Sequence, residues 1–204
     1  MRHNQDVLEL GLSQPTSPAG RQLVILDKNH DLYIAKTLKS QFKKLGSMVE
    51  SFAWNDETET LFALTDGKFV VWYYPNAIFV DEDIAPMTRL DRDATHIGKN
   101  AQCVSFVGTH CVLRRSDGAM VNMGDISPLP GMLQEFAKKK QWEEAIRLCR
   151  HMKMPELWAC LAVMSLFGQD LNTAEVAYAA IDEVSFLLMV QLRVHVFSNT
   201  HDNQ

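Results

Sequence analysis

The side chains able to catalyse a reaction or bind a metal ion are scattered along this sequence. Its seven histidines and four cysteines include no pair at a metal-ligand spacing on one helix face. Cys149 and His151 come nearest, yet residues two apart on a helix point to different sides. The sequence lacks the catalytic motifs G-x-S-x-G and H-E-x-x-H, and it lacks a glycine-rich phosphate-binding loop. We therefore expect no catalytic residue, no metal site, no cofactor and no small-molecule substrate.

Three clusters leave alternatives to this interpretation open. The acidic run Asp81-Glu82-Asp83 could bind a cation, although a solvated loop is the simpler interpretation. A basic cluster could meet an acidic protein surface or RNA, but interspersed glutamates favour an ordinary exposed helix face. This cluster comprises Lys138, Lys139, Lys140, Arg147, Arg150 and Lys153. Trp142 and Trp158 could each anchor a partner, although packing between helices is the commoner role of such residues.

The cysteine pattern predicts reduced thiols. No two cysteines form a C-x-x-C pair and residues 1–22 hold no secretory signal, which indicates a reducing, cytosolic setting. Cys103 and Cys111 could face each other on a hairpin, which leaves a disulfide as the alternative. Cys149 falls on the apolar face of a predicted helix, where its thiol would be protonated and therefore a poor nucleophile.

Composition excludes several classes of protein. The net charge of -5 argues against nucleic acid as the main partner, because phosphate binding normally shows as a basic excess. The apolar content of 47% is enough for a core, which makes global disorder unexpected. The longest apolar run, residues 186–197, is interrupted by Gln191, Arg193 and His195 and is too short to span a bilayer. We expect no membrane insertion, and strand, helix or neither stays open for that run.

Residues 49–75 predict three consecutive β-strands. Along 49–54 the smaller Val49, Ser51 and Ala53 alternate with Glu50, Phe52 and Trp54; 60–64 is a second run, and 68–74 is rich in β-branched and aromatic side chains. Asp66-Gly67 is a strong tight-turn signal between the last two runs, since Gly tolerates a positive φ. Antiparallel strands joined in this way form a meander, which is the core of a propeller blade.

The same strand pattern occurs on both sides of this stretch. Further strands are predicted at residues 22–26, 31–37, 103–107, 110–115 and 119–123. Ser51-Phe52 recurs as Ser105-Phe106, and Thr65-Asp66-Gly67 recurs as Ser116-Asp117-Gly118. A strand repeat of about 40 to 50 residues is typical of propellers. We therefore predict a partial β-propeller over residues 1–126, with the polar stretch 76–100 as an inter-blade excursion containing a fourth strand.

The pattern becomes helical from residue 127. Helices are predicted from residue 132 onward, with Pro155 in a first turn, Gly168 as a stop, and Asn172 with Glu175 as a capping box. Similar short segments of the predicted helices recur after roughly 30 residues, which is close to the period of tetratricopeptide repeats. Residues 127–184 are therefore predicted to begin an α-solenoid, which makes the chain a mixed β-then-α protein.

Several short segments of the sequence resemble the intraflagellar transport protein 80 family over roughly residues 1–184. The strand words match its second propeller: Asp27-Lys28-Asn29, Asp31-Leu32-Tyr33-Ile34, Ala53-Trp54-Asn55-Asp56, Val71-Trp72-Tyr73-Tyr74-Pro75-Asn76, Val104-Ser105-Phe106-Val107-Gly108 and Arg114-Arg115-Ser116-Asp117-Gly118. The helical words are Trp142-Glu143, Arg147-Leu148-Cys149-Arg150, Trp158-Ala159-Cys160-Leu161-Ala162, Thr173-Ala174-Glu175 and Ala177-Tyr178-Ala179-Ala180-Ile181.

The resemblance implies a non-catalytic scaffold. The family has two WD40-type propellers followed by helical repeats, and it belongs to complex B, which moves cargo along cilia. It implies that the partners are other intraflagellar transport complex B subunits, and that the location is the cilium, the ciliary basal body and the cytoplasm. A generic propeller–solenoid adaptor of a vesicle coat or another ciliary complex is the alternative. An enzyme using the acidic loop or the basic cluster is a third, less supported, interpretation.

Two departures from the family lead to a further expectation. The first propeller and the early blades of the second are absent, and residues 185–204 read as a divergent tail. We therefore expect a truncated isoform or a fragment. An unclosed propeller has an open edge and a short solenoid lacks an end cap, which predicts a marginally stable, association-prone chain.

Overall fold

The computed structural model describes residues 5–14, 20–37, 41–124 and 126–181 of the chain. The chain divides into two compact units, residues 1–132 and 133–204, and each is described by itself. Within the described ranges, no helix has the length and apolar character needed to cross a membrane.

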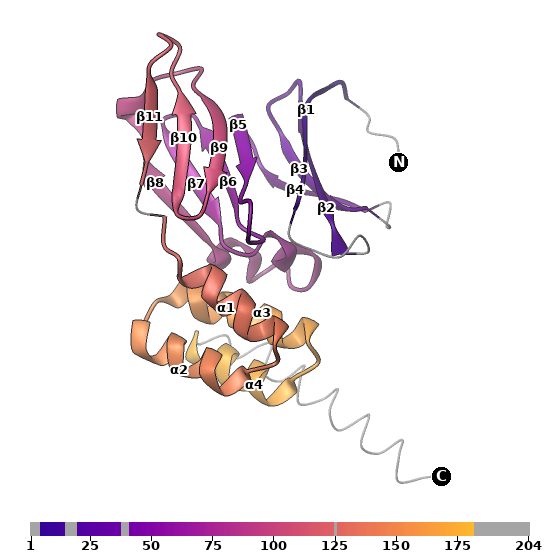
Figure 1. The fold of residues 1–204 in the computed structure, drawn as a ribbon. Coiled ribbons are helices and arrows are strands. Elements are labelled where there is room, and N and C mark those ends of the chain that lie inside the picture. The colour runs from indigo at the N-terminus through magenta and orange to yellow at the C-terminus, as the bar shows by residue number, and fades with distance from the viewer. Residues whose placement is uncertain (1–4, 15–19, 38–40, 125, 182–204) are drawn as a thin grey trace. The chain divides into compact units, whose positions relative to one another are not determined.

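The described part of the first unit contains eleven strands in three antiparallel sheets (Figure 1). Sheet A consists of β1 (Val7–Leu12), β2 (Gln22–Asp27), β3 (Leu32–Lys36) and β4 (Phe42–Gly46). Sheet B consists of β5 (Val49–Trp54), β6 (Leu61–Thr65), β7 (Lys68–Trp72) and β8 (Arg89–Asp93). Sheet C consists of β9 (Gln102–Val107), β10 (His110–Arg114) and β11 (Met120–Met123). Within each sheet, strands that are consecutive in sequence pair with each other, so each sheet is a meander.

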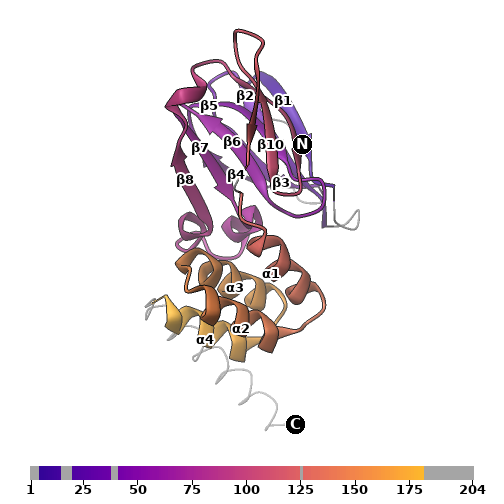
Figure 2. The same cartoon turned by 60° about the vertical axis from the view of Figure 1, so that its left-hand side comes forward.

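The first strands of the three sheets lie next to one another. β5 contacts both β1 and β9. Figure 2 shows the same sheets from a second direction. Trp54 of β5 donates an indole hydrogen bond to the Gly11 carbonyl of β1 at 3.3 Å. The Cys103 amide of β9 donates to the Ser51 hydroxyl of β5 at 3.0 Å. This is the arrangement of successive propeller blades, which confirms the predicted fold class.

Sheet B is buried on both faces, because its side chains alternate between sheets A and C. The core toward sheet A combines Phe52, Leu61, Ala63, Val70 and Trp72 of sheet B with Val24, Leu26, Leu32 and Ile34 of sheet A. On the opposite face, Phe62 stacks on Phe69 with ring centroids 5.6 Å apart. Phe62 also meets Phe106 of sheet C edge-on at 6.2 Å. The two faces therefore hold three blades together.

The turn after β5 joins sheet B to sheet C through hydrogen bonds. The buried Asn55 side chain accepts the backbone amides of Glu57 and Thr58 at 3.1 and 2.9 Å. Its amide nitrogen donates to the Gly108 carbonyl at 2.8 Å, and the Asp56 carboxylate accepts the Gly108 amide at 3.1 Å. This polar turn thus pairs its own backbone amides with hydrogen-bond acceptors and links sheet B to sheet C.

Most of the predicted strands are present with boundaries within two residues. The Asp66-Gly67 turn lies between β6 and β7 with Gly67 at φ 72°, as the turn chemistry predicts. The predicted fourth strand of the excursion is β8, reached through the 3-10 helices η2 (Pro75–Phe79) and η3 (Ala85–Thr88); η4 (Thr95–Ile97) follows it. β1 and β4 were not predicted as strands, because Val7–Leu12 precedes a loop-rich segment and β4 contains two lysines.

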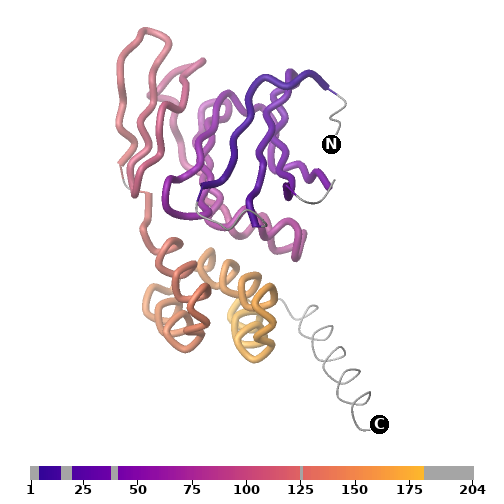
Figure 3. The backbone as a smooth tube through the Cα atoms, turned by 45° about the vertical axis from the view of Figure 1, so that its right-hand side comes forward, coloured from indigo at the N-terminus to yellow at the C-terminus, as the bar shows by residue number. Residues whose placement is uncertain are grey.

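The second unit is helical (Figure 3). Its helices are α1 (Leu129–Lys138), which begins at the end of the first unit, α2 (Trp142–Met152), α3 (Pro155–Phe167) and α4 (Leu171–Ala180). α3 contacts both α2 and α4, and α2 contacts α4. The buried residues of α3 cover its whole circumference: Leu157, Ala159, Cys160, Leu161, Ala162, Val163, Met164 and Ser165. A helix buried all round lies at the centre of a helical unit, so the described helices form the predicted tetratricopeptide-like arrangement.

Two details of the helical prediction were wrong. Helix α1 begins at Leu129 rather than residue 132, because Pro130 lies in the first turn, where its missing amide hydrogen costs no intrahelical bond. The capping box at Asn172 is replaced by Asp170, whose carboxylate accepts the Thr173 amide at 2.9 Å. The predicted first-turn Pro155 and the stop at Gly168 are confirmed.

Gly11→Ala should destabilise the first unit. A Cβ at Gly11 would lie 2.4 Å from Cε2 of Phe52, so the ring or β1 must move. We expect the free energy of unfolding to fall by about 1–3 kcal/mol, as in overpacked cores. Gly46→Ala is the matched control, since its Cβ would meet Trp72 no closer than 3.6 Å. Chemical denaturation of both variants tests this, and equal stabilities would contradict the close packing of β1 on β5.

Asp170→Ala should loosen the start of α4. Losing an N-cap carboxylate typically costs about 1 kcal/mol. Asn172→Ala is the control, because this residue is not the cap. Amide hydrogen exchange at Thr173 and Ala174 should accelerate in the first variant alone. Equal acceleration of exchange in both variants would contradict the cap at Asp170 and support the predicted capping box at Asn172.

Candidate functional site

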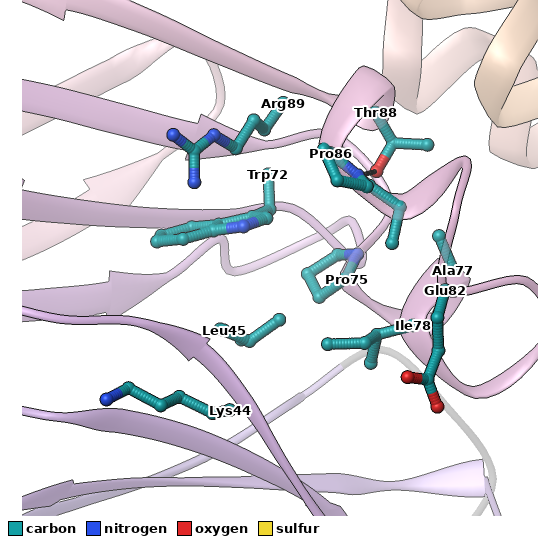
Figure 4. Close-up of a pocket in the computed structure, with 11 residues that line it drawn as sticks. Lys44, Leu45, Trp72, Pro75, Ala77, Ile78, Glu82, Pro86, Thr88 and Arg89 are labelled. Atoms are coloured by element: carbon teal, nitrogen blue, oxygen red, sulfur yellow. Dashed lines mark hydrogen bonds between the residues drawn. The ribbon is translucent and has the colours of Figure 1, made fainter.

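One hollow in the first unit lies between sheets A and B beside Trp72. Figure 4 shows Trp72 of β7 pointing into it together with Leu45 of β4 and Arg89 of β8. The hollow has a volume of about 170 Å³. Its other lining residues are Lys44, Pro75, Ala77, Ile78, Glu82, Ala85, Pro86 and Thr88. The floor is therefore mainly apolar and the charged groups lie at its rim.

The local sequence explains why this hollow forms. Pro75 follows β7, lacks the amide hydrogen that a further ladder position needs, and instead opens η2. Pro86 plays the same part in η3, where the Thr88 hydroxyl donates to the Ala85 carbonyl at 2.8 Å (Figure 4). The two 3-10 helices thus turn the chain away from sheet B before it returns as β8. Together with β4 they border the hollow beside Trp72.

A second hollow of about 330 Å³ adjoins the first and shares Trp72 and Arg89 with it. It is further lined by Gly46, Ser47, Met48, Thr65, Asp66, Lys68, Val70 and Asp91. Met48 is 65% exposed there and has φ 57°, which directs the β4–β5 turn outward. We call the two hollows together the Trp72 groove.

Charges at the rim of the Trp72 groove are paired in the structure. The Lys44 ammonium lies 2.7 Å from the Asp31 carboxylate, and Arg89 lies 2.9 Å from Asp91. Lys43 forms an ion pair with Glu82. The hydrogen bond from Lys44 lowers the pKa of Asp31, and the same bond raises the pKa of Lys44. Apolar side chains inside a rim of both charge signs suit the binding of a short peptide.

The thiols of the helical unit are unreactive by environment. Burial raises the pKa of Cys149 to about 12, so the thiol is protonated at neutral pH, as the sequence predicts. Burial also raises the pKa of Cys160 well above its ordinary value. In sheet C, burial and then a hydrogen bond with Cys111 raise the pKa of Cys103. Cys103 and Cys111 are both free thiols in the structure.

The acidic run has structural contacts. Asp81 accepts the amides of Asp83 and Ile84 at 3.0 and 3.3 Å, which closes a turn. Glu82, which lies between η2 and η3, forms an ion pair with Lys43 of β4. In the parts of the chain that the structure describes, no three His, Cys, Asp or Glu side chains converge as metal ligands. In the structure, the acidic run therefore stabilises the turn between η2 and η3 and pairs it with β4.

Three of the six cationic side chains in the basic cluster of the helical unit form ion pairs in the structure. Glu135 lies 3.4 Å from Lys138 and 3.6 Å from Lys139, and Arg147 lies 2.7 Å from Glu144. Trp142 packs on the backbone of Gly168, where an added Cβ would meet its ring at 2.7 Å. Trp142 is half-buried and also lines an open hollow of about 660 Å³ between the first turns of α2 and α4. Trp158 is also half-buried.

Sequence reasoning missed the Trp72 groove. Trp72 itself is part of the blade core, since only 4% of its surface is exposed. The groove depends on β4 and on the path of η2 and η3, neither of which was predicted. Pro75 and Pro86 are the signal that could have indicated it, because two prolines in one excursion restrict where the chain can pair.

Comparisons with known proteins cover most of the chain. The family model described as IFT80 second beta-propeller matches residues 1–129. The model described as IFT80/172/WDR35/WDR19 TPR domain matches residues 157–202. This second match extends into residues 185–204, which lie outside the described residues, so their assignment as a divergent tail stays a prediction.

Two curated relatives are similar over most of the chain. Each is an intraflagellar transport protein 80 homolog, one from Rattus norvegicus and one from Mus musculus. Each is 44% identical over 188 residues, which is 90% of this chain. The chain spans 24% of the length of either relative.

Lys44→Met should raise the pKa of Asp31 toward that of a free aspartate. Asp31 now titrates low because Lys44 stabilises its charged form, so this pair stabilises the fold above the ordinary Asp pKa and loses that effect as pH falls. Lys43→Met is the control, since Lys43 pairs with Glu82 instead. Carbon-detected NMR titration of Asp31 tests both variants. An unchanged Asp31 pKa in Lys44→Met would contradict the assigned pair.

Proposed function

Because this chain belongs to the intraflagellar transport protein 80 family, we propose that it is a non-catalytic scaffold segment of intraflagellar transport complex B. It acts in cilium assembly and intraciliary transport by contacting other complex B subunits. Its location is the cilium, the ciliary basal body and the cytoplasm. The observation that supports this is the match of the second-propeller family model over residues 1–129.

The chemistry of the described surfaces agrees with a binding role. The Trp72 groove offers apolar contacts inside a rim of both charge signs, which is the composition of a small protein-recognition site. The hollow between α2 and α4 has a half-buried Trp142, a residue type enriched where partners anchor. The thiols with raised pKa values supply no nucleophile. These features favour assembly through protein contacts over catalysis.

The proposal predicts capture of complex B subunits from cells. Tagged full chain should recover these subunits from a ciliated-cell extract, identified by mass spectrometry. Recovery of chaperones alone would contradict the proposal, because the chain would then lack a functional binding surface.

Charge reversal separates the two candidate surfaces in the same experiment. Arg89→Glu alters the Trp72 groove, whereas reversing Lys138, Lys139 and Lys140 to Glu alters only the helical unit. Rim charges mainly affect association, so recovery should fall roughly threefold or more for the variant at the surface in use. The other variant serves as its control. Unchanged recovery for both would place the contact on neither surface.

A further inference from the structure

The turn between β10 and β11 carries an exposed serine. Figure 1 shows this turn at the upper end of sheet C. Ser116 is exposed, and so are Asp117 and Gly118, which follow it. Among the residues that the structure describes, the Ser116 hydroxyl has no hydrogen-bond partner. The hydroxyl is therefore open to a reagent from solvent.

Backbone bonds define the turn around this serine. The Gly118 amide donates to the Arg115 carbonyl, and the Arg115 amide donates to the Ala119 carbonyl, both at 2.9 Å. Ser116 and Asp117 are therefore the two central residues of a β-turn, and Gly118 follows with φ 85°. The Asp117 carboxylate accepts the Ala119 amide at 3.0 Å. The turn thus pairs its own backbone without using the serine side chain.

Two consecutive arginines precede Ser116, and the sequence contains such a pair only here. Arg114 is exposed and donates to the Gln102 side chain at 2.6 Å. The Arg115 guanidinium lies 3.3 Å from the Asp117 carboxylate, and both of these side chains are partly exposed. Contacts of this exposed kind are worth at most about 1 kcal/mol. Both guanidinium groups can therefore exchange their present partners for carboxylates of another protein at little cost.

The equivalent turn of sheet B provides an internal comparison. Thr65-Asp66-Gly67 aligns with Ser116-Asp117-Gly118 in the strand repeat. The Thr65 hydroxyl donates to the Lys68 carbonyl at 3.3 Å. The two residues before it, Ala63 and Leu64, are buried and uncharged. A turn of this kind therefore needs neither an unbonded hydroxyl nor preceding cations, and of these two turns only the one in sheet C combines both.

The hydroxyl can also be brought into the active site of an enzyme. Arg114 and Met120 form the last strand pair of β10 and β11 before the turn. Beyond this pair, two backbone bonds and the Asp117 carboxylate hold residues 115–119. Exposed loop tips with few bonds open at a small cost in free energy, and the rest of the sheet stays folded.

We propose that Ser116 is a phosphorylation site for a protein kinase that selects arginine immediately before its target residue. Kinases discriminate between substrates partly by charge pattern, and the planar fork of arginine matches carboxylates in an acidic substrate groove. In the transfer, the Ser116 oxygen forms a bond to the γ-phosphorus of ATP while the bond from this phosphorus to the β–γ bridging oxygen breaks. ADP leaves, and a kinase carboxylate accepts the hydroxyl proton.

The added phosphate changes the charge of this turn. Residues 114–118 hold two arginines and one aspartate, which gives them a formal charge of +1. A phosphoserine adds about −1.5 to −2 charges, so the turn becomes net negative. The phosphate also competes with Asp117 for Arg115, because phosphate accepts bidentate bonds from a guanidinium. This inference goes beyond the proposed function and its test needs no ciliary component, so the two can fail separately.

Phosphorylation of the full chain in vitro tests the proposal. The chain is incubated with magnesium ATP and the catalytic subunit of cAMP-dependent protein kinase, and in parallel with protein kinase C and with an Aurora kinase. In at least one reaction we expect a mass gain of about 80 Da, the mass of one phosphoryl group. Peptide mapping by mass spectrometry should place this group on Ser116 and leave Thr65 unmodified.

Variants separate the hydroxyl from the charge pattern. Ser116→Ala should abolish the mass gain, and Ser116→Thr, which keeps a hydroxyl, should retain it. Arg114→Gln combined with Arg115→Gln should slow transfer to Ser116 roughly tenfold or more, because the selected charges are lost. Neither arginine is buried, and circular dichroism checks that this double variant keeps its fold.

Two results would overturn the proposal. One is the absence of phosphate on Ser116 of the full chain in all three reactions. A synthetic peptide of residues 110–121 then shows the cause: a modified peptide would mean that the fold withholds the serine, and an unmodified one that its sequence is not recognised. The other is transfer at an unchanged rate in the double glutamine variant, which would mean that the arginines do not direct it.

Discussion

The first unit depends on the burial of sheet B on both faces. Because strand side chains alternate, one sheet can contribute Phe52 and Trp72 to one core and Phe62 to another. Neither sheet A nor sheet C has this two-sided support within the described structure. The polar turn at Asn55 adds hydrogen bonds where the apolar contact with sheet C ends. Sheet B is therefore the element on which the neighbouring sheets are assembled.

Much of the fold could be predicted because its signals are local. Asp66-Gly67 fixes a turn and Pro155 fixes a helix start through chemistry that the residues themselves impose. β4 was missed because its lysines serve an outer edge, where charge is favoured over the alternation that identifies a strand. The cap at Asp170 was missed because Asn172 offers equally good chemistry and only the helix path distinguishes the two. The order of the two parts followed from the change from strand to helix pattern at residue 127, and the family resemblance implied the same order.

The candidate site was less predictable than the fold for a related reason. The Trp72 groove arises where three separate segments approach one another, and no single word of sequence encodes that approach. Its rim charges also look ordinary in sequence, since Asp31 precedes β3 and Lys44 belongs to β4. The negative prediction for Cys149 succeeded because burial of a thiol follows from helix periodicity alone. Chemistry that depends on one element can be predicted, whereas surfaces made by several elements need the structure.

The placement of the four tryptophans has a practical optical consequence. Trp54 and Trp72 belong to the sheets, and Trp142 and Trp158 to the helices. Replacing either pair with phenylalanine would leave intrinsic fluorescence that reports on one unit alone. Two such spectra, recorded during a single denaturant titration, would separate the melting of the blades from that of the helical repeats.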